Sequence, residues 1–298
     1  MINPLEVWHS PEVKELLADF FKANFKYAGV NDSLAEEIIN LSWDTRKKSA
    51  NVPEMMQLIG QKFEYAKTLV TQDVKEVNSI DIFDYSKVCS YLDVGANKLD
   101  TINYLMQEYS NIERFIGIDI IPKRGKFSRP NKGIYYKVTN DAKNFPIKNN
   151  SIDLINIQFV LHHFAGIDSI RRMLQNCKQA LKKGGRLILW EESFRRDTNI
   201  KDLCKKNHQI NIRTDETLTQ RFYNLDDDQK WEFIIANDWI INIKNPHMPW
   251  TGEYYVWDKW VELLKEYGLI LRREFNLGLR VNGKLKQGVH IIGEFSSE

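Results

Sequence analysis

The sequence predicts an α/β protein with a doubly wound, mostly parallel seven-stranded sheet and a helical N-terminal region. Between residues 88 and 192, short apolar runs alternate with helical stretches. Such alternation is typical of βαβ units, whose right-handed crossovers place helices on both faces of a sheet. Before residue 80, apolar residues recur at helical spacing instead. Two apolar runs near the C-terminus flank Asn282-Gly283, which is a turn signal.

The elements follow from these runs in chain order. Strands are expected at 88–94, 115–120, 133–138, 152–159 and 186–190, with helices near 98–109 and 167–182. A further helix that includes Trp257 and Trp260 should end before Gly268. The last two strands are expected at 269–275 and 289–295. We predict a helical N-terminal cap at 1–84 and a core at 85–298, with an inserted lid at about 193–252.

Composition restricts the class of protein. The 298 residues have a net charge of +2 and three cysteines with no C-x-x-C pair, so neither a disulfide framework nor a metal site is expected. No apolar run is long enough to span a bilayer, and the first residues do not resemble a signal peptide. We therefore expect a cytoplasmic protein with no membrane contact. Residues 121–213 hold 20 Lys and Arg against seven Asp and Glu, which favours an anionic partner if these charges meet in space.

Polar residues and glycine follow the ends of the predicted strands. Asp93 lies at the end of the first strand and Gly95 follows it, Asp119 ends the second, and Asp141 follows the third. The fourth strand leads into Gln158 and the residues after it. Because ligands of open α/β sheets bind beyond the carboxyl ends of the strands, these residues are candidates for one cofactor site. An acid at the place of Asp119 can bind the hydroxyls of a ribose.

The order of these motifs resembles that of the class I S-adenosylmethionine-dependent methyltransferases. The segments that carry the resemblance are YLDVGANKLDTINYL, FIGIDII, SIDLINIQFVLHHF and LKKGGRLILWEES. They cover residues 88–192, and the closing pair 269–295 also fits. The resemblance implies a Rossmann-like methyltransferase fold and S-adenosyl-L-methionine as cofactor. The cofactor-binding residues that it implies are Asp93, Gly95, Ala96, Asn97, Asp119, Ile120, Asp141, Ala142, Gln158 and Phe159.

The loop after the first strand departs from the family pattern. Asn97 and Leu99 stand where later glycines are expected. Asn tolerates left-handed backbone angles. We expect that Leu99 does not tolerate them and that it adds bulk beside the cofactor.

Candidate acceptor-side residues follow the fourth and fifth strands. His162, His163 and Glu191 are the catalytic candidates, since a base is needed where the acceptor carries a proton. Side chains alternate on a strand, so one of Glu191 and Glu192 is expected to face the acceptor and the other solvent. Either one alternatively pairs with Arg195 or Arg196. Of the aromatic residues in 231–260, Trp250, Tyr254 and Tyr255 are the candidate acceptor contacts.

The leading hypothesis is methyl transfer to an oxygen, nitrogen or carbon of a small-molecule acceptor held under an aromatic lid. The first alternative is an RNA methyltransferase of the mRNA cap guanine-N7 type, because the segment from Gln158 to Phe164 is similar to the Q-F-x-x-H-Y segment of that family. The basic middle third would suit RNA phosphates. The second alternative is a scaffold that keeps the fold without the chemistry, motivated by Asn97 and Leu99.

Overall fold

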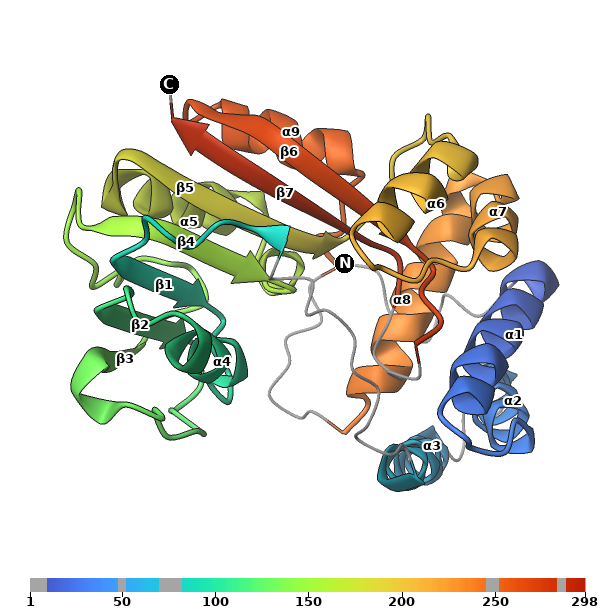
Figure 1. Ribbon diagram of the computed structural model, residues 1–298. Coiled ribbons are helices and arrows are strands. Elements are labelled where there is room, and N and C mark those ends of the chain that lie inside the picture. Colours follow the sequence, from blue (N-terminus) through green and yellow to red (C-terminus); the bar gives the residue numbers. More distant parts are fainter. Residues whose placement is uncertain (1–9, 48–51, 70–81, 245–251, 283–287, 298) are drawn as a thin grey trace. The chain divides into compact units, whose positions relative to one another are not determined.

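The computed structural model of the protein describes residues 10–47, 52–69, 82–244, 252–282 and 288–297 (Figure 1). These residues form two compact units, and each is described by itself. Unit 1 takes its described residues from Met1–Ile80, Phe194–Trp250 and Asn276–His290. Unit 2 takes them from Asp81–Ser193, Thr251–Phe275 and Ile291–Glu298.

A seven-stranded sheet with the order β3-β2-β1-β4-β5-β7-β6 confirms the predicted fold class. The central strand β1 pairs in parallel with β2 and β4, and β3 and β5 extend the sheet in parallel on either side. The order reverses at β1, so the carboxyl ends of β1, β2 and β4 flank a topological switch point. The strands are β1 Ser90–Val94, β2 Arg114–Asp119, β3 Gly133–Lys137, β4 Ile152–Gln158, β5 Leu181–Glu192, β6 Leu269–Gly278 and β7 His290–Ser297.

The helices of unit 2 form where apolar residues recur every three or four positions. They are α4 Asp100–Glu108, α5 Ile167–Ala180 and α9 Trp257–Lys265, with short 3-10 turns η4 Pro130–Lys132 and η5 Leu161–His163. Helix α5 buries Ile170, Met173, Leu174 and Cys177, which lie on one face. Trp257 and Trp260 are fully buried in the same core. Gly268 adopts a φ of +69°, as predicted for the residue that follows this helix.

Unit 1 is helical. The predicted N-terminal helices are confirmed within the described residues as α1 Pro11–Tyr27, α2 Ser33–Lys47 and α3 Val52–Leu69. They are joined by α6 Ile200–Gln209, α7 Glu216–Asn224 and α8 Asp227–Asn242. Phe233 of α8 packs against Phe20 of α1 and Phe222 of α7, with ring centroids 6.0 and 5.4 Å apart. None of the described helices is long and apolar enough to cross a membrane.

Helices α6, α7 and α8 were not predicted from the sequence. Helix α8 is buried without interruption from Glu232 to Ile241, so it lacks the polar face that makes a helix recognisable. Each of the three helices nevertheless begins at an N-cap, and the cap side chain accepts a hydrogen bond from the third residue after it. The caps are Asn199, Asp215 and Asp226, and Asp226 forms a capping box with Gln229.

Candidate functional site

The turn after β1 requires glycine at its first position. Gly95 has a φ of +76°, and a Cβ added to it would lie 2.2 Å from Cγ2 of Val160 in the segment after β4. The N–H groups of Gly95 and Ala96 both donate to the Ile118 carbonyl, at 2.8 and 3.1 Å. The turn is therefore held against the end of β2 and in contact with the end of β4.

The backbone conformation of Leu99 differs from the one predicted. Both Asn97 and Leu99 adopt left-handed angles, with φ of 41° and 68°, so the expectation that Leu99 does not tolerate them was wrong. The left-handed conformation costs about 1–2 kcal/mol in a residue with a Cβ. The Leu99 side chain is fully buried and faces Gly117 of β2. Burial of a leucine contributes about 1.5–3 kcal/mol, which offsets the strain. Its bulk is thus taken up by the interior of unit 2.

Asp119 has a fixed carboxylate at the end of β2. Its Oδ2 accepts a hydrogen bond from the Asn97 N–H at 2.9 Å, and its Oδ1 accepts one from the Ile121 N–H at 3.2 Å. Asp119 and the adjacent Ile120 are both half-buried. Because an ionised carboxylate has about four acceptor positions, two remain for a ligand that carries hydroxyl groups.

Asp93 lies beneath the turn rather than on the surface. It is buried, and its Oδ1 accepts hydrogen bonds from Asn156 Nδ2 of β4 at 2.8 Å and from the Tyr91 hydroxyl at 3.4 Å. Burial raises the pKa of Asp93 to about 7, although these two hydrogen bonds oppose the shift. Asp93 therefore links β1 to β4 and supports the turn from below.

The turn that follows β3 is tied to α5. Asp141 Oδ1 accepts hydrogen bonds from the Thr139 hydroxyl at 2.6 Å and from the Lys143 N–H at 3.2 Å, and these hold the pKa of Asp141 well below its usual range. Arg172 of α5 donates to the Asp141 carbonyl at 2.7 Å. Asn176 donates to the carbonyl of Ala142, which is buried with a φ of 55°.

The end of β4 places Phe159 against β5. Gln158 pairs in register with Trp190, and the Phe159 N–H donates to the Trp190 carbonyl at 2.8 Å. Phe159 has a φ of 55°, and its ring centroid lies 5.1 Å from that of Trp190. Both Gln158 and Phe159 are half-buried.

Backbone strain is concentrated at this edge of the sheet. Among the described residues, six non-glycine residues have positive φ, and four of them follow β1, β3 or β4. These four are Asn97, Leu99, Ala142 and Phe159. The other two are Asn150 and Asn211. Because asparagine, Asn97 included, tolerates this conformation, the strained residues are Leu99, Ala142 and Phe159. Strained residues of this kind cluster where a ligand is held, so the strain indicates a binding site at the carboxyl ends of these strands.

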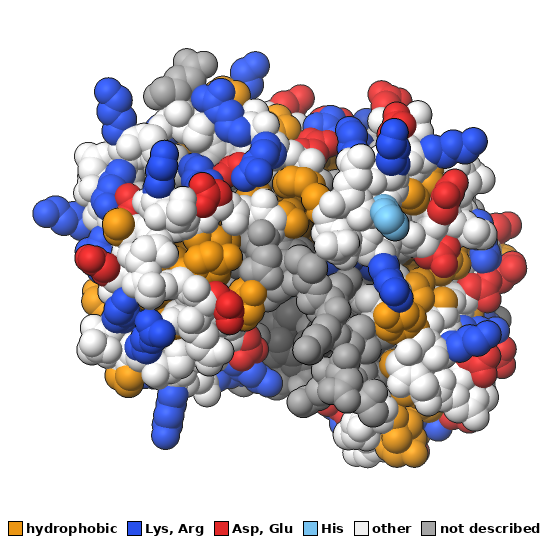
Figure 2. Space-filling model, viewed as in Figure 1, with side chains coloured by type: hydrophobic (Ala, Val, Ile, Leu, Met, Phe, Trp, Pro, Cys, Tyr) orange, Lys and Arg blue, Asp and Glu red, His pale blue; other side chains and the backbone are white. Residues whose placement is uncertain are grey.

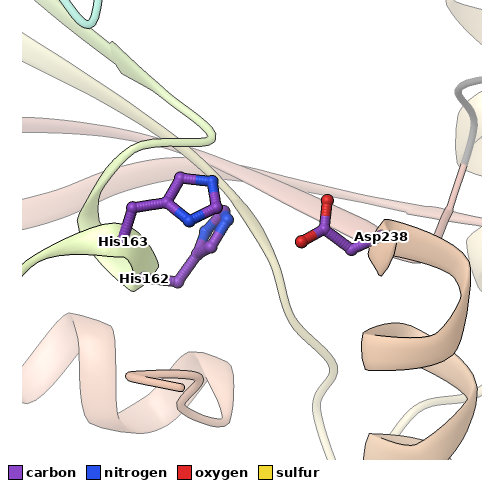
Figure 3. A group of neighbouring side chains, drawn as sticks. All are labelled: His162, His163 and Asp238. Atoms are coloured by element: carbon purple, nitrogen blue, oxygen red, sulfur yellow. The ribbon is translucent and has the colours of Figure 1, made fainter. Parts of the chain in front are cut away.

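His162 and Glu191 form a buried pair at the ends of β4 and β5. His162 Nδ1 lies 2.5 Å from Glu191 Oε2, and Glu191 Oε1 accepts hydrogen bonds from the N–H groups of Val160 and Leu161 at 3.2 and 2.8 Å. The carboxylate therefore fixes both the ring and the turn that carries it. Figure 3 shows His162 beside His163 in η5, and their ring centroids are 3.9 Å apart. The third residue in Figure 3, Asp238, comes from α8 of unit 1.

The alternation expected for Glu191 and Glu192 was wrong, because both are buried. The Oε2 atom of Glu192 lies 4.0 Å from His162 Nε2, so the imidazole has a carboxylate near each nitrogen. Arg196 pairs with Asp227 at 2.6 Å.

The aromatic candidates divide into three cases. The Tyr254 ring stacks on His162, with centroids 4.9 Å apart and planes inclined by 18°. The Tyr255 ring packs edge-on against Trp260, and its hydroxyl donates to Glu253, so it belongs to the core of unit 2. Trp250 lies outside the described residues.

Comparison with known proteins places the fold in a family. Residues 92–189 match the family model described as a methyltransferase domain. This part of the chain is a methyltransferase domain. The predicted resemblance to the class I S-adenosylmethionine-dependent methyltransferases is confirmed over this range. A comparison of the sequence with curated proteins finds no match.

Solved structures similar to the chain include methyltransferases of low sequence identity. A TehB-like enzyme from Corynebacterium glutamicum is 13% identical, with a TM-score of 0.43 over 83% of this chain and 100% of that chain. An S-adenosylmethionine-dependent methyltransferase from Listeria monocytogenes, described as putative, is 13% identical, with a TM-score of 0.44 over 74% of this chain and 94% of that chain. A Burkholderia thailandensis 1,6-didemethyltoxoflavin-N1-methyltransferase, solved with S-adenosylhomocysteine, is 10% identical, with a TM-score of 0.41 over 70% and 71%. At these TM-scores the likenesses say nothing about the acceptor of this chain.

Gly95 and Gly184 have the same left-handed backbone conformation, but only at Gly95 would an added Cβ meet a neighbouring atom. Comparing alanine substitutions at the two positions separates the steric clash from the backbone strain. Gly95→Ala should destabilise the methyltransferase domain by about 2–4 kcal/mol, because strain and a clash with Val160 add. Gly184 has a φ of +75° with open space around its Cβ position, so Gly184→Ala should cost only about 1 kcal/mol. Urea unfolding measures both, and the double variant Gly95→Ala/Val160→Ala should regain part of the loss. Equal losses for the two single variants would contradict the close contact.

The raised pKa of Asp93 predicts a pH dependence of stability. Between 3.8 and about 7 the folded protein keeps a proton on Asp93 that the unfolded chain has lost, so this group lowers stability as the pH rises through that window. Asp93→Asn keeps an acceptor for Asn156 and removes the effect. The variant should gain several degrees in Tm at about pH 8 and little at about pH 4, at roughly 2–4 °C per kcal/mol. A gain of the same size at both pH values would show that charge is not the cause.

Proposed function

We propose that the protein is an S-adenosylmethionine-dependent methyltransferase that binds its cofactor at the carboxyl ends of β1 to β4. The observation that carries the proposal is the Asp119 carboxylate, which two backbone N–H groups orient beside the glycine turn. The strained residues after β1, β3 and β4 lie at the same edge and support it. The match of residues 92–189 to the methyltransferase-domain model agrees with this chemistry.

The residues at this edge suit each part of the cofactor. Asp119, with two acceptor positions left, fits the ribose hydroxyls. The turn of Gly95, Ala96 and Asn97 is assigned to the amino-acid part, with Asp93 supporting it from below. We assign Asp141 and Ala142 to the border of the adenine and Ile120 to a place beside the ribose. Gln158 and Phe159 are assigned to the end of the cofactor that carries the methyl group. When bound, S-adenosylmethionine supplies a methyl group on a sulfonium.

The chain then has to align an acceptor and exclude water from it. We propose that His162 faces the acceptor. Because Glu191 holds the Nδ1 proton, Nε2 is the nitrogen that takes a proton from an O–H or N–H acceptor. Glu191 acts as a positioning residue, since its other oxygen is occupied by Val160 and Leu161. Tyr254 supplies an aromatic surface that packs on the imidazole.

A small-molecule acceptor fits this arrangement better than a polymer. His162 is 1% exposed and Glu191 is fully buried, so an acceptor group has to reach buried side chains. Asn97 and Leu99 no longer support the alternative of a scaffold without the chemistry. Both residues keep the left-handed turn, and the Asn97 N–H binds Asp119. The RNA cap alternative predicts turnover with capped RNA, and an acceptor screen that includes such RNA distinguishes the two classes.

Asp119→Ala tests the cofactor site. Calorimetric titration with S-adenosylhomocysteine should give a dissociation constant in the roughly micromolar to sub-millimolar range for the unmodified protein and at least a tenfold weaker one for the variant. Glu113→Ala is the matched control. It removes an exposed carboxylate immediately before β2, at the opposite edge of the sheet. Equal affinity in Asp119→Ala, or no binding by the well-folded unmodified protein, would contradict the proposal.

The two histidines are tested once an acceptor is found by screening transfer of a labelled methyl group. His162→Gln should lower kcat by about 10²–10⁴-fold, the usual contribution of a positioned base, without a change in affinity for S-adenosylhomocysteine. His163→Gln removes the ring beside His162 and should lower kcat by a smaller factor. Loss of turnover in His163→Gln alone would assign the base to His163, and full activity in both would exclude a histidine base.

A further inference from the structure

Tyr135 lies on β3, the strand at one end of the sheet, directly beside β2. Figure 2 shows Lys and Arg side chains projecting at the lower left, where Figure 1 places β2 and β3. In this part of the molecule Tyr135 is half-buried, whereas its neighbour Tyr136 is 36% exposed. The two side chains point to opposite faces of the sheet, because side chains alternate along a strand.

The ring of Tyr135 packs over Gly117 of β2, its partner in the parallel register. A Cβ on this glycine would lie 3.2 Å from Cδ2 of Tyr135, 3.0 Å from Cβ of Ala96 and 3.2 Å from Cδ2 of Leu99. Ala96 and Leu99 both belong to the turn after β1. The ring therefore supports the turn that supplies one of the two N–H donors to Asp119.

The hydroxyl of Tyr135 contacts the turn that supplies the other donor. It donates a hydrogen bond to the Ile121 carbonyl at 2.7 Å. The N–H group of Ile121 is the second donor to Asp119, at 3.2 Å. Burial and the nearby charge of Asp119 raise the pKa of Tyr135, although Arg124 opposes the shift, so the hydroxyl keeps its proton and remains a donor. One side chain thus contacts both turns from which Asp119 receives hydrogen bonds.

A hydrogen bond that orders a binding group before the ligand arrives raises the affinity for that ligand. Without the Tyr135 hydroxyl, the turn at 119–121 gains conformational freedom. A ligand that binds the Asp119 carboxylate then has to order this turn, and its affinity falls accordingly. A hydrogen bond that served folding alone would change the stability of the protein but not the affinity of its folded state.

We propose that Tyr135 is a positioning residue of the cofactor site, which holds the Asp119 carboxylate in the orientation that binds the ribose hydroxyls. Its ring supports the turn after β1, and its hydroxyl fixes the turn after β2. Tyr135 acts through Asp119 and not by contact with the cofactor. This inference rests on the proposed function, because that function assigns Asp119 to the ribose.

A double-mutant cycle with Tyr135→Phe and Asp119→Ala tests the proposal by calorimetric titration with S-adenosylhomocysteine. Tyr135→Phe keeps the ring over Gly117 and removes only the hydroxyl. It should weaken the affinity about three- to tenfold, as expected for the loss of one hydrogen bond. In the Asp119→Ala background, the same substitution should change the affinity by less than about twofold, because the residue through which Tyr135 acts is gone. Equal weakening in both backgrounds would overturn the proposal.

Tyr136→Phe is the matched control. It removes a hydroxyl from an exposed side chain one residue further along β3, on the opposite face of the sheet. Its affinity for S-adenosylhomocysteine should equal that of the unmodified protein. Unchanged affinity in Tyr135→Phe, or equal weakening by the two tyrosine variants, would also overturn the proposal.

Amide hydrogen exchange without ligand separates this proposal from the proposed function. Tyr135→Phe should speed exchange at Ile121 about three- to tenfold, and Tyr136→Phe should not. Unchanged exchange at Ile121 in Tyr135→Phe would show that the hydroxyl does not order the turn, and would overturn the proposal even where S-adenosylhomocysteine binds. If the unmodified protein does not bind S-adenosylhomocysteine, the proposed function fails, and faster exchange at Ile121 would still support the ordering of Asp119 by Tyr135.

Discussion

The hydrogen bond from the Asn97 N–H to the Asp119 carboxylate joins the turn after β1 to the end of β2. Asn97 presents this N–H only while the turn keeps its left-handed angles, and Gly95 begins the turn because Val160 leaves no room for a Cβ. The orientation of Asp119 toward a ligand therefore depends on the left-handed turn that follows the neighbouring strand, β1. The parallel register of β1 between β2 and β4 makes this coupling possible.

On the other side of β1, the buried pair of His162 and Glu191 likewise joins the end of one strand to the turn after its neighbour. Glu191 accepts hydrogen bonds from two backbone N–H groups as well as from the imidazole, so the end of β5 fixes the turn after β4. Each half of the candidate site is thus a polar side chain held by the backbone of a neighbouring strand. Such support keeps a site rigid before a ligand arrives, which is what alignment of a methyl donor and an acceptor requires.

The sequence predicted the sheet, the position of each strand and the edge at which the candidate residues meet, because apolar runs and glycine record these features directly. It did not predict that Leu99 adopts a left-handed conformation, because the compensating contact with Gly117 lies on another strand. Nor did alternation along β5 indicate that Glu191 and Glu192 are both buried, since their position depends on His162. Helices α6 to α8 were missed although their caps are visible in the sequence.

The central claim is that a cofactor is held by the turns at the carboxyl ends of β1 to β4. Amide hydrogen exchange with and without S-adenosylhomocysteine tests it most directly, because it reports each turn separately. We expect added protection at 95–99, 119–121, 139–142 and 158–161, and none at 110–114 or 149–152, which lie at the opposite edge of the sheet. Protection at the opposite edge, or at no part of the methyltransferase domain, would contradict the account.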